Sequence, residues 1–332
     1  MIITRTPFRI SFFGGGTDYP VWYKENGGAV LSTTFNKYCY ISCRYLPPYF
    51  DYRYLIRYRL REEKQNICEI DHPSVRECLN YLRIEKGVEI VHTSDIPARS
   101  GVGSSSSFTV GLLNALYALK GKIVTKRQLA RDSLHVEQKL IKENVGSQDQ
   151  VAASFGGFNK IEFSSEDDFY VYPITIQQER IDLLQSHLIL FFTGFERYSS
   201  DIACEQVKQT PNKKNELEFM KSMVDEAIKI LDAESDDISD FGRLLDESWK
   251  VKKGLTKLIS NDYIDEIYVT AVKAGAIGGK LLGAGGGGFI LFFAPPERHQ
   301  SIREKLKSFL HVPFGFEKLG TQVVMYSTQE LY

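Results

Sequence analysis

The sequence has little that would indicate a disulfide-rich, membrane-spanning or secreted protein. Its five cysteines are odd in number and include no Cys-x-x-Cys pair, so we expect free thiols in a reducing compartment. A metal site on Cys39 and Cys43 would need a distant histidine and is not favoured. No segment approaches the roughly 18 apolar residues of a membrane-spanning helix, and residues 1–7 lack the apolar core of a signal peptide. We therefore expect a cytoplasmic protein.

An excess of charge of either sign is also missing. The net charge is −1, which predicts no nucleic-acid or membrane partner and requires any polyanionic ligand to be held locally. The 332 residues, 43% hydrophobic and 25% charged, suit one large or two medium globular domains. We place a boundary near residue 180, between domains 1–180 and 181–332, because the second part is dominated by predicted helices at 214–232, 238–254 and 261–276.

A glycine–serine segment at 95–107 reads Asp-Ile-Pro-Ala-Arg-Ser-Gly-Val-Gly-Ser-Ser-Ser-Ser, between a predicted strand at 88–93 and a predicted helix at 108–119. Its glycines permit a tight turn, and the unpaired N–H groups and positive dipole end of the helix suit a phosphate. The serine hydroxyls can add hydrogen bonds or a magnesium ligand. The candidate phosphate-binding residues are Arg99, Ser100, Gly101, Val102, Gly103, Ser104, Ser105 and Ser106.

The alternative for this segment is a flexible loop, because it completes no standard phosphate-binding motif. No Gly-Lys-Ser/Thr follows, as a Walker A loop requires, and Ser106 replaces the last glycine of Gly-x-Gly-x-x-Gly.

A second glycine-rich segment, Gly-Gly-Gly-Thr-Asp at 14–18, follows an alternating run at 7–13 that predicts a strand. Three glycines let the backbone pass close to a ligand, and the loop carboxylate of Asp18 is a natural partner for sugar hydroxyls. Asp18 can also be a turn aspartate that caps its own backbone. The candidate sugar-binding residues here are Gly15, Gly16, Thr17 and Asp18.

Two carboxylates lie on predicted helices. Glu137 shares the apolar face of a helix predicted over 125–144, where a carboxylate is costly unless it binds a cation or forms a salt bridge. Asp149 lies in the first turn of a short helix whose Ser147 and Gln150 match a capping box. The helix dipole favours a negative charge there, and that effect alone can account for Asp149.

A third glycine-rich segment, Gly-Ala-Gly-Gly-Gly-Gly at 283–288, precedes a predicted strand at 289–293 and so does not match a dinucleotide loop. Its glycines must let backbone approach backbone or ligand, which makes Gly285 and Gly286 candidate substrate residues. A helix at 297–310 and a strand at 321–327 complete the predicted elements.

The arginines of residues 53–61, interleaved with tyrosines, admit three interpretations. Such a pattern occurs in nucleic-acid-binding surfaces, but a strand with a solvated face is favoured. Contact of one of these arginines with a substrate phosphate is the third.

Together the three glycine-rich segments resemble the motifs of the GHMP small-molecule kinases. The resemblance rests on Pro-Phe-Arg-Ile-Ser-Phe-Phe-Gly-Gly-Gly-Thr-Asp at 7–18, Pro-Ala-Arg-Ser-Gly-Val-Gly-Ser-Ser-Ser-Ser at 97–107 and Lys-Leu-Leu-Gly-Ala-Gly-Gly-Gly-Gly at 280–288, in family order. It spans nearly the whole chain. It implies an α+β fold of two domains, the first resembling part of a ribosomal protein and the second ferredoxin-like.

The resemblance also implies roles for individual residues. ATP would lie under the second motif, Mg²⁺ would be held by Glu137 and Ser105, and Asp149 would be the catalytic base with Arg9 beside it. Asp18 would bind the sugar, and the glycines of the third motif would close the site.

The Gly-Gly-Gly-Thr-Asp form, with Thr-Gly-Phe-Glu-Arg-Tyr-Ser at 193–199, is similar to the heptose branch of the family. That branch phosphorylates the anomeric hydroxyl of D-glycero-D-manno-heptose 7-phosphate, on the way to nucleotide-activated heptose for bacterial surface polysaccharide. A second anion site would be needed, for which the candidates are Arg99, Arg197, Lys280 and the arginines of 53–61.

Three other functions stay open. Another sugar-1-kinase, for fucose, galactose or an N-acetylhexosamine, would share the same motifs. A non-catalytic ATP- and sugar-binding sensor is disfavoured by intact Arg9, Glu137 and Asp149. A decarboxylase acting on a phosphorylated mevalonate derivative is disfavoured by the sugar-like first motif. No feature decides whether the protein is a homodimer.

Overall fold

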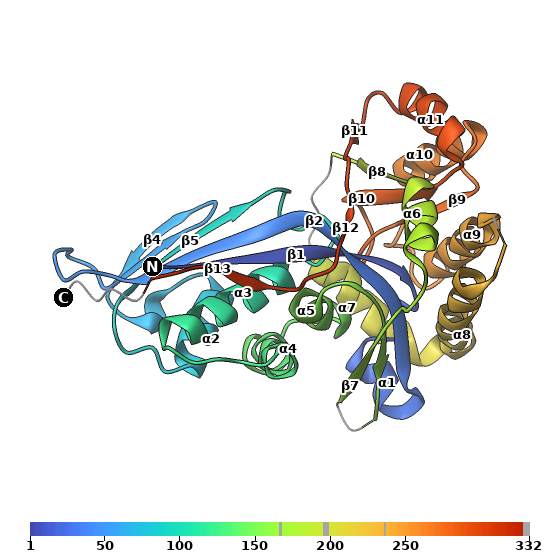
Figure 1. Cartoon of the computed structure of the whole chain (residues 1–332). Helices are drawn as coiled ribbons and strands as arrows, with labels where there is room; N and C mark the ends of the chain where they lie inside the picture. Colours follow the sequence, from blue (N-terminus) through green and yellow to red (C-terminus); the bar gives the residue numbers. More distant parts are fainter. Residues whose placement is uncertain (166–167, 195–198, 236, 328–332) are drawn as a thin grey trace.

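The computed structural model describes residues 1–165, 168–194, 199–235 and 237–327, and two β-sheets organise them (Figure 1). The first sheet has the strand order β13-β1-β2-β5-β3-β4, while β12 and β6 also pair with β2 and β7 pairs with β6. The bounds are β1 Ile2–Phe13, β2 Gly28–Tyr45, β3 Tyr54–Arg57, β4 Arg61–Lys64, β5 Val88–Ser94, β6 Phe158–Phe163, β7 Phe169–Pro173, β12 Phe316–Glu317 and β13 Gln322–Tyr326.

The long strands β1 and β2 pair antiparallel along most of their length and carry the first sheet. The first part of β2 pairs with β6 and its second part with β5, so this strand belongs to two ends of the sheet. Helices cover one face of the sheet (Figure 1), and apolar side chains of α3 pack against β1 and β2. The helices of this half are α1 Pro20–Asn26, α2 Pro73–Tyr81, α3 Ser104–Leu119, α4 Lys126–Leu134 and α5 Gln148–Phe155, with a 3₁₀ turn, η1, at Ile67–Glu69.

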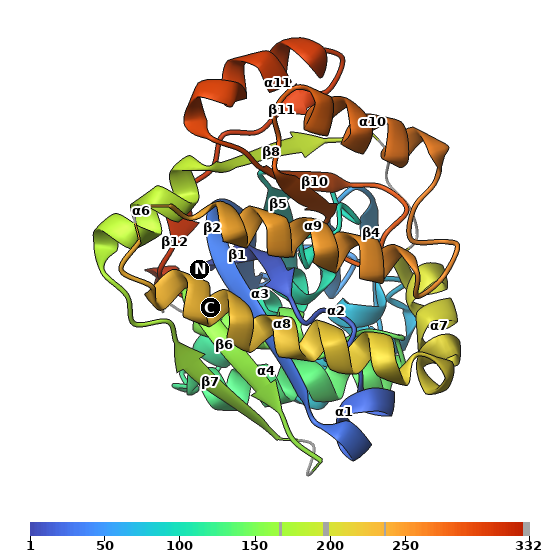
Figure 2. The same cartoon turned by 90° about the vertical axis from the view of Figure 1, so that its right-hand side faces the viewer.

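The second sheet is antiparallel throughout, with the order β11-β8-β10-β9. Its strands are β8 Leu188–Phe192, β9 Gly278–Leu281, β10 Phe289–Phe293 and β11 Leu310–His311. The helices of this half are α6 Gln178–Ser186, α7 Ser199–Gln209, α8 Lys214–Asp232, α9 Ser239–Lys253, α10 Asp262–Lys273 and α11 His299–Lys305, with 3₁₀ turns η3 Thr210–Asn212 and η4 Pro296–Arg298. Figure 2 shows α8 and α9 side by side; α8 packs on β1 and β2 and α9 on β9, so this pair joins the two sheets.

Most predicted elements lie where the sequence pattern put them, including the helix over 214–232. The helix predicted over 125–144 is different. Thr125 caps it as expected, since its hydroxyl accepts from the N–H of Gln128 at 3.1 Å. Beyond α4, however, the chain widens into a π-helical segment, η2 (His135–Ile141), and ends at Lys142 with a φ of +63°. A π-helical turn inside a helix is a frequent feature of functional sites.

Two further predictions were wrong in detail. The capping box before α5 does not form, because the Gln150 amide donates to Glu137 and the Ser147 hydroxyl accepts from the Gln138 amide instead. The helix predicted over 297–310 ends at Lys305, and the chain then enters β11.

The end of the described chain returns to the first sheet. β13 pairs with β1, and β12 pairs with β2. The division into 1–180 and 181–332 stays a prediction, and these two strands lie in the first sheet although that division assigns them to the second domain. None of the described helices is long and apolar enough to cross a membrane. All five cysteines are free.

Candidate active site

An open pocket draws residues from both sheets and from α3, α5, α7 and α9. It brings together parts of all three glycine-rich segments. Its lining contains Arg9, Ser11, Gly15, Gly16, Asp18, Tyr19, Arg99, Gly101, Gly103, Ser104, Ser105, Ser106, Asn144, Val145, Gly146, Gln148, Asp149, Ala203, Gln206, Lys252, Lys280, Gly283 and Ala284.

The second glycine-rich segment forms a tight bend that leads into α3. Gly101 and Gly103 have φ of +84° and +77°, a region that side chains rarely allow. The first helical hydrogen bond of α3 runs from the N–H of Ser107 to the carbonyl of Gly103 at 2.9 Å. The N–H groups of residues 104–106 precede that bond and therefore have no partner within the helix. This end of α3 has the geometry of an anion site at the wall of the pocket.

Arg9 connects the bend to Asp149. Its Nε and Nη2 donate to the two carboxylate oxygens of Asp149 at 2.6 and 2.8 Å, and its Nη1 donates to the carbonyl of Gly101 at 2.8 Å. A bidentate guanidinium–carboxylate pair fixes both position and orientation. Gly103 stands directly behind, since a Cβ there would lie 3.2 Å from Asp149 Oδ2. The carboxylate of Asp149 is thus held against the bend in one orientation.

Asp18 lies in the same pocket and is buried. Its carboxylate accepts from the N–H of Gly16 at 2.9 Å and from the N–H of Gln148 at 3.4 Å. Burial raises the pKa of Asp18, and the nearby Asp149 adds to this, while the two N–H donors oppose it. Gly146 makes room for this carboxylate, because a Cβ there would lie 2.0 Å from Asp18 Oδ2. The two acids therefore face one pocket from different elements, Asp18 from a loop and Asp149 from the first turn of α5.

Glu137 lies behind the bend rather than in the lining of the pocket. It is fully buried, and its Oε2 accepts from Ser106 Oγ at 2.9 Å and from the Gln150 amide. Its Oε1 has no hydrogen-bond partner among the residues that the structure describes. Burial raises the pKa of Glu137 to about 7. A buried, half-satisfied carboxylate is what a cation would stabilise.

Glu137 and the serines of the bend fit a Mg²⁺ ion that is also coordinated by the phosphates of a nucleotide. The described residues contain no group of three or more His, Cys, Asp or Glu side chains that could hold a metal. Magnesium, however, commonly uses one or two carboxylates together with waters and substrate phosphates. Ser106 contacts Glu137 because it is on the buried side of α3, whereas Ser105 is exposed to the pocket. The magnesium roles expected for Glu137 and Ser105 stay predictions.

The third glycine-rich segment packs on the bend. A Cβ at Gly283 would lie 2.5 Å from the Cα of Gly101, so here two backbones meet directly. Gly285 and Gly286 do not line the pocket, since they pack on Ile259: a Cβ at Gly285 would lie 2.7 Å from the Cα of Ile259, and the N–H of Gly286 donates to its carbonyl at 2.9 Å.

Other predicted site residues also support the loops instead of lining the pocket. The Thr17 hydroxyl donates to the carbonyls of Gly14 and Ala29 and is buried. Ser100 is buried, with its hydroxyl on the carbonyl of Pro97. Val102 is buried, and its carbonyl accepts from the N–H of Arg9.

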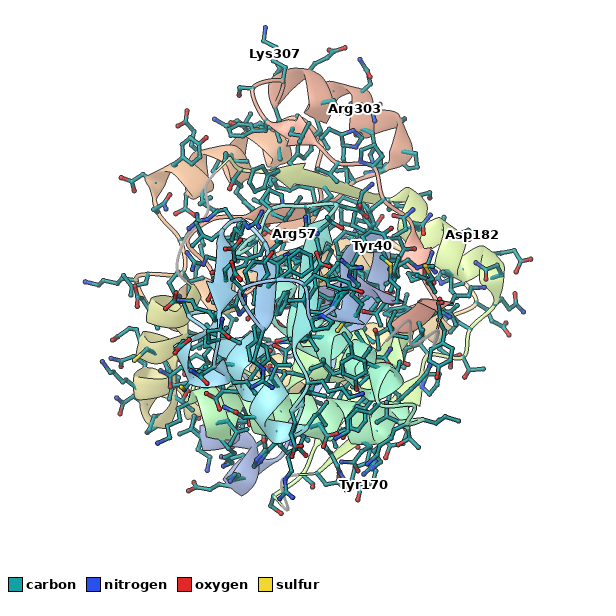
Figure 3. The ribbon with its side chains drawn as sticks, turned by 90° about the vertical axis from the view of Figure 1, so that its left-hand side faces the viewer. Tyr40, Arg57, Tyr170, Asp182, Arg303 and Lys307 are labelled. Atoms are coloured by element: carbon teal, nitrogen blue, oxygen red, sulfur yellow. The ribbon has the colours of Figure 1, made fainter. Side chains whose placement is uncertain are left out.

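The arginines expected to bind a second phosphate differ in whether they line the pocket. Arg99 lines the pocket. Arg57, labelled in Figure 3, lies on β3 and donates to Glu89, and Arg61 donates to Glu63 on the same hairpin. No residue of 53–61 lines the pocket. Arg197 lies outside the described residues, as does most of its motif at 193–199.

Sequence reasoning missed Lys252, Ser11 and Gln148, which all line the pocket. Lys252 on α9 follows the buried positions Leu245 and Ser248 at helical spacing. The argument that drew attention to Glu137, a charged side chain on an apolar stripe, would have found it. Ser11 and Gln148 carry no comparable signal in the sequence.

Comparison with known proteins identifies the family of the chain. The family models described as GHMP kinases N terminal domain and GHMP kinases C terminal match residues 73–157 and 225–312. The D-glycero-alpha-D-manno-heptose 7-phosphate kinase of Campylobacter jejuni is 31% identical, over 92% of this chain and 93% of that protein. A bifunctional fucokinase/GDP-fucose pyrophosphorylase of Arabidopsis thaliana is 24% identical, over 91% of this chain but 30% of that protein.

A crystal structure described as a D-glycero-D-manno-heptose 1-phosphate kinase from Bacteroides thetaiotaomicron superposes with a TM-score of 0.78 at 25% identity, over 98% of this chain and 100% of that chain. The two-domain α+β fold expected from the motifs is therefore confirmed. By its matched domains, its relatives and its fold, the chain belongs to the GHMP kinase family.

Proposed function

We propose that the protein transfers the γ-phosphoryl group of ATP to the anomeric hydroxyl of D-glycero-D-manno-heptose 7-phosphate. The observation that carries the proposal is the link from Asp149 through Arg9 to the carbonyl of Gly101, which joins a proton acceptor to a phosphate-binding bend. The 31% identity to a heptose 7-phosphate kinase supports the acceptor. A reaction that uses ATP and supplies nucleotide-activated heptose would take place in the cytoplasm.

The chemistry needs alignment and charge stabilisation more than a covalent intermediate. The sugar hydroxyl gives its proton to Asp149 as its oxygen bonds to the γ-phosphorus. The bond from that phosphorus to the bridging oxygen breaks, and ADP leaves. The Arg9 guanidinium stabilises the charge that develops between base and phosphoryl group, and it holds Asp149 in position throughout.

The triphosphate would be bound by the N–H groups at the start of α3. Glu137, with the serines of the bend, would hold Mg²⁺, which when bound neutralises charge on the phosphates. Asp18, whose carboxylate faces the pocket beside Asp149, would accept hydrogen bonds from sugar hydroxyls and orient the acceptor.

Coupled ADP release tests the proposal. Wild-type protein would be assayed with heptose 7-phosphate, unphosphorylated heptose, fucose, galactose, an N-acetylhexosamine and mevalonate, and the product identified by ³¹P NMR. We expect turnover with heptose 7-phosphate and a new anomeric phosphate. Absence of ADP release with every sugar would refute the kinase assignment, and would leave the sensor alternative.

A fucose kinase is the second candidate, because the fucokinase relative matches 91% of this chain. A kcat/KM for fucose above that for heptose 7-phosphate would favour it.

A further inference from the structure

Two lysines in the pocket are buried without an acidic partner. Lys252 on α9 is 6% exposed and Lys280 on β9 is 2% exposed, and both line the pocket. Lys280 Nζ donates to the carbonyl of Phe12 at 2.6 Å, and Lys252 Nζ donates to the carbonyls of Leu281 and Gly283 at 3.1 and 2.5 Å. Among the described residues, no carboxylate forms an ion pair with either ammonium group.

Both ammonium groups retain unused hydrogen-bond donors. An ammonium group has three N–H donors, so Lys280 keeps two and Lys252 keeps one after these backbone contacts. Burying a cation with unsatisfied hydrogen-bond donors costs folding free energy unless an anion accepts those hydrogen bonds. The pocket is therefore built to receive an anion at this place.

The pKa values of the two lysines and the charges around them also favour an anion at this place. Burial first and Arg9 second lower the pKa of Lys252, against the opposing effect of Asp18, to about 7. Burial, then Lys252 and Arg9, lower the pKa of Lys280 well below its usual range. Since Arg9 is already paired with Asp149, Asp18 is the remaining acid among these groups. A doubly charged anion would stabilise the charged form of both lysines and so oppose these pKa shifts.

The position of the lysines favours the acceptor over the nucleotide. Lys280 is held by Phe12, at the entry to the segment of residues 14–18 that carries Asp18. In the same part of the pocket, Ser11 Oγ and Gln148 Oε1 are buried polar atoms without a hydrogen-bond partner. The side chains of Ser11 and Gln148 flank Gly15, since a Cβ there would lie 3.6 Å from Ser11 Oγ and 3.7 Å from Gln148 Nε2. The nucleotide has its own donors at residues 104–106.

We infer that Lys252 and Lys280 bind a phosphate group carried by the acceptor sugar. This inference rests on the proposed function and gives it a substrate class: phosphorylated sugars in preference to free ones. It also separates the two anions of the reaction, with the nucleotide phosphates on α3 and the acceptor phosphate between α9 and β9.

The test compares Lys252→Met and Lys280→Met with wild type by titration calorimetry. Methionine keeps the apolar stem that packs in the pocket and removes the charge. Heptose 7-phosphate and unphosphorylated heptose are titrated into protein loaded with AMPPNP. We expect each substitution to weaken the affinity for heptose 7-phosphate at least tenfold, as for loss of a charged hydrogen bond. The affinity for unphosphorylated heptose should change less than threefold.

Lys250→Met is the matched control, because Lys250 lies on the same helix, is exposed and pairs with Asp246. We expect it to change neither affinity. AMPPNP affinity is expected to stay within threefold, and the melting temperature of each variant checks separately that it folds.

Several results would overturn the inference. Equal loss of both sugars would show that the lysines only shape the pocket, and loss of AMPPNP binding would assign them to the nucleotide. If wild type binds both sugars equally, the inference fails while a sugar kinase stands. Inorganic phosphate tests the anion site without a sugar. If wild type binds phosphate and both lysine variants do not, the anion site is supported even if no sugar is turned over. If the variants bind phosphate as well as wild type does, the anion site is contradicted.

Discussion

Replacing Asp149 by asparagine removes the proposed proton acceptor while keeping the size of the side chain. Both carboxylate oxygens now accept from Arg9, at 2.6 and 2.8 Å. Asparagine offers one acceptor oxygen, so one of these two bonds is lost. The contact of Arg9 with Gly101 remains, and the phosphate-binding bend should keep its shape.

The size of the effect follows from these contacts. Loss of a general base costs about 10²- to 10⁴-fold in rate, which is about 3–5 kcal/mol of activation free energy. Removing one partner of a buried ion pair costs about 3–5 kcal/mol of stability. The Asp149 side chain is 23% exposed, so we expect a smaller loss, on the order of 2 kcal/mol.

The assay measures kcat and single-turnover phosphoryl transfer, with AMPPNP affinity by calorimetry. We expect turnover to fall at least 100-fold, while AMPPNP affinity stays within about threefold because Asp149 donates nothing to the nucleotide. Asp225→Asn, which breaks an exposed pair with Lys160 at 2.7 Å, is the control and should leave turnover unchanged. If Asp149→Asn retains more than a tenth of wild-type kcat, Asp149 is not the base.

Three further predictions use burial, charge and backbone geometry. Burial raises the pKa of Glu137 from 4.5 to about 7, so its ionisation costs no folding stability below pH 4.5, an increasing amount between pH 4.5 and 7, and the full amount above pH 7. Glu137→Gln should therefore raise the melting temperature of the metal-free protein at pH 8 and abolish magnesium-dependent turnover. An unchanged melting temperature would contradict the burial argument. The lowered pKa values of Lys252, about 7, and of Lys280 mean that affinity for heptose 7-phosphate should fall as pH rises above 7, by about tenfold per pH unit for each lysine that must take up a proton on binding. Lys252→Met should reduce this slope. Calorimetry across pH 6.5–9 measures it, and constant wild-type affinity would argue against contact of these lysines with the phosphate. Gly101→Ala should weaken AMPPNP binding at least tenfold, because its Cβ would lie 2.6 Å from the carbonyl of Leu282. Gly121→Ala is the control: its φ is also positive but its Cβ would have no atom within 4 Å, so it should cost about 1 kcal/mol of stability and leave AMPPNP binding unchanged. Equal AMPPNP binding by both variants would count against the bend as the nucleotide site.

The glycine–serine bend at residues 99–106 and its flanking elements could be recognised from the sequence, for local reasons. Gly101 and Gly103 adopt torsions that other residues avoid, so a strand, a glycine turn and a helix can be recognised from neighbours along the chain alone. The apolar periodicity of α8 is equally local, and its bounds match the predicted 214–232.

Only the tertiary structure decided which side chains meet in the pocket. Lys252 and Lys280 come from a helix and a strand far from Asp18 in the chain, and their proximity depends on how the two sheets pack. Likewise, only the packing of α3 places Ser106 within hydrogen-bond distance of Glu137. The return of β13 to β1 is another long-range pairing that local patterns do not encode. Local sequence determines backbone shape, because torsional preferences act within a few residues; the convergence of charges requires packing, because it joins residues that the chain keeps apart.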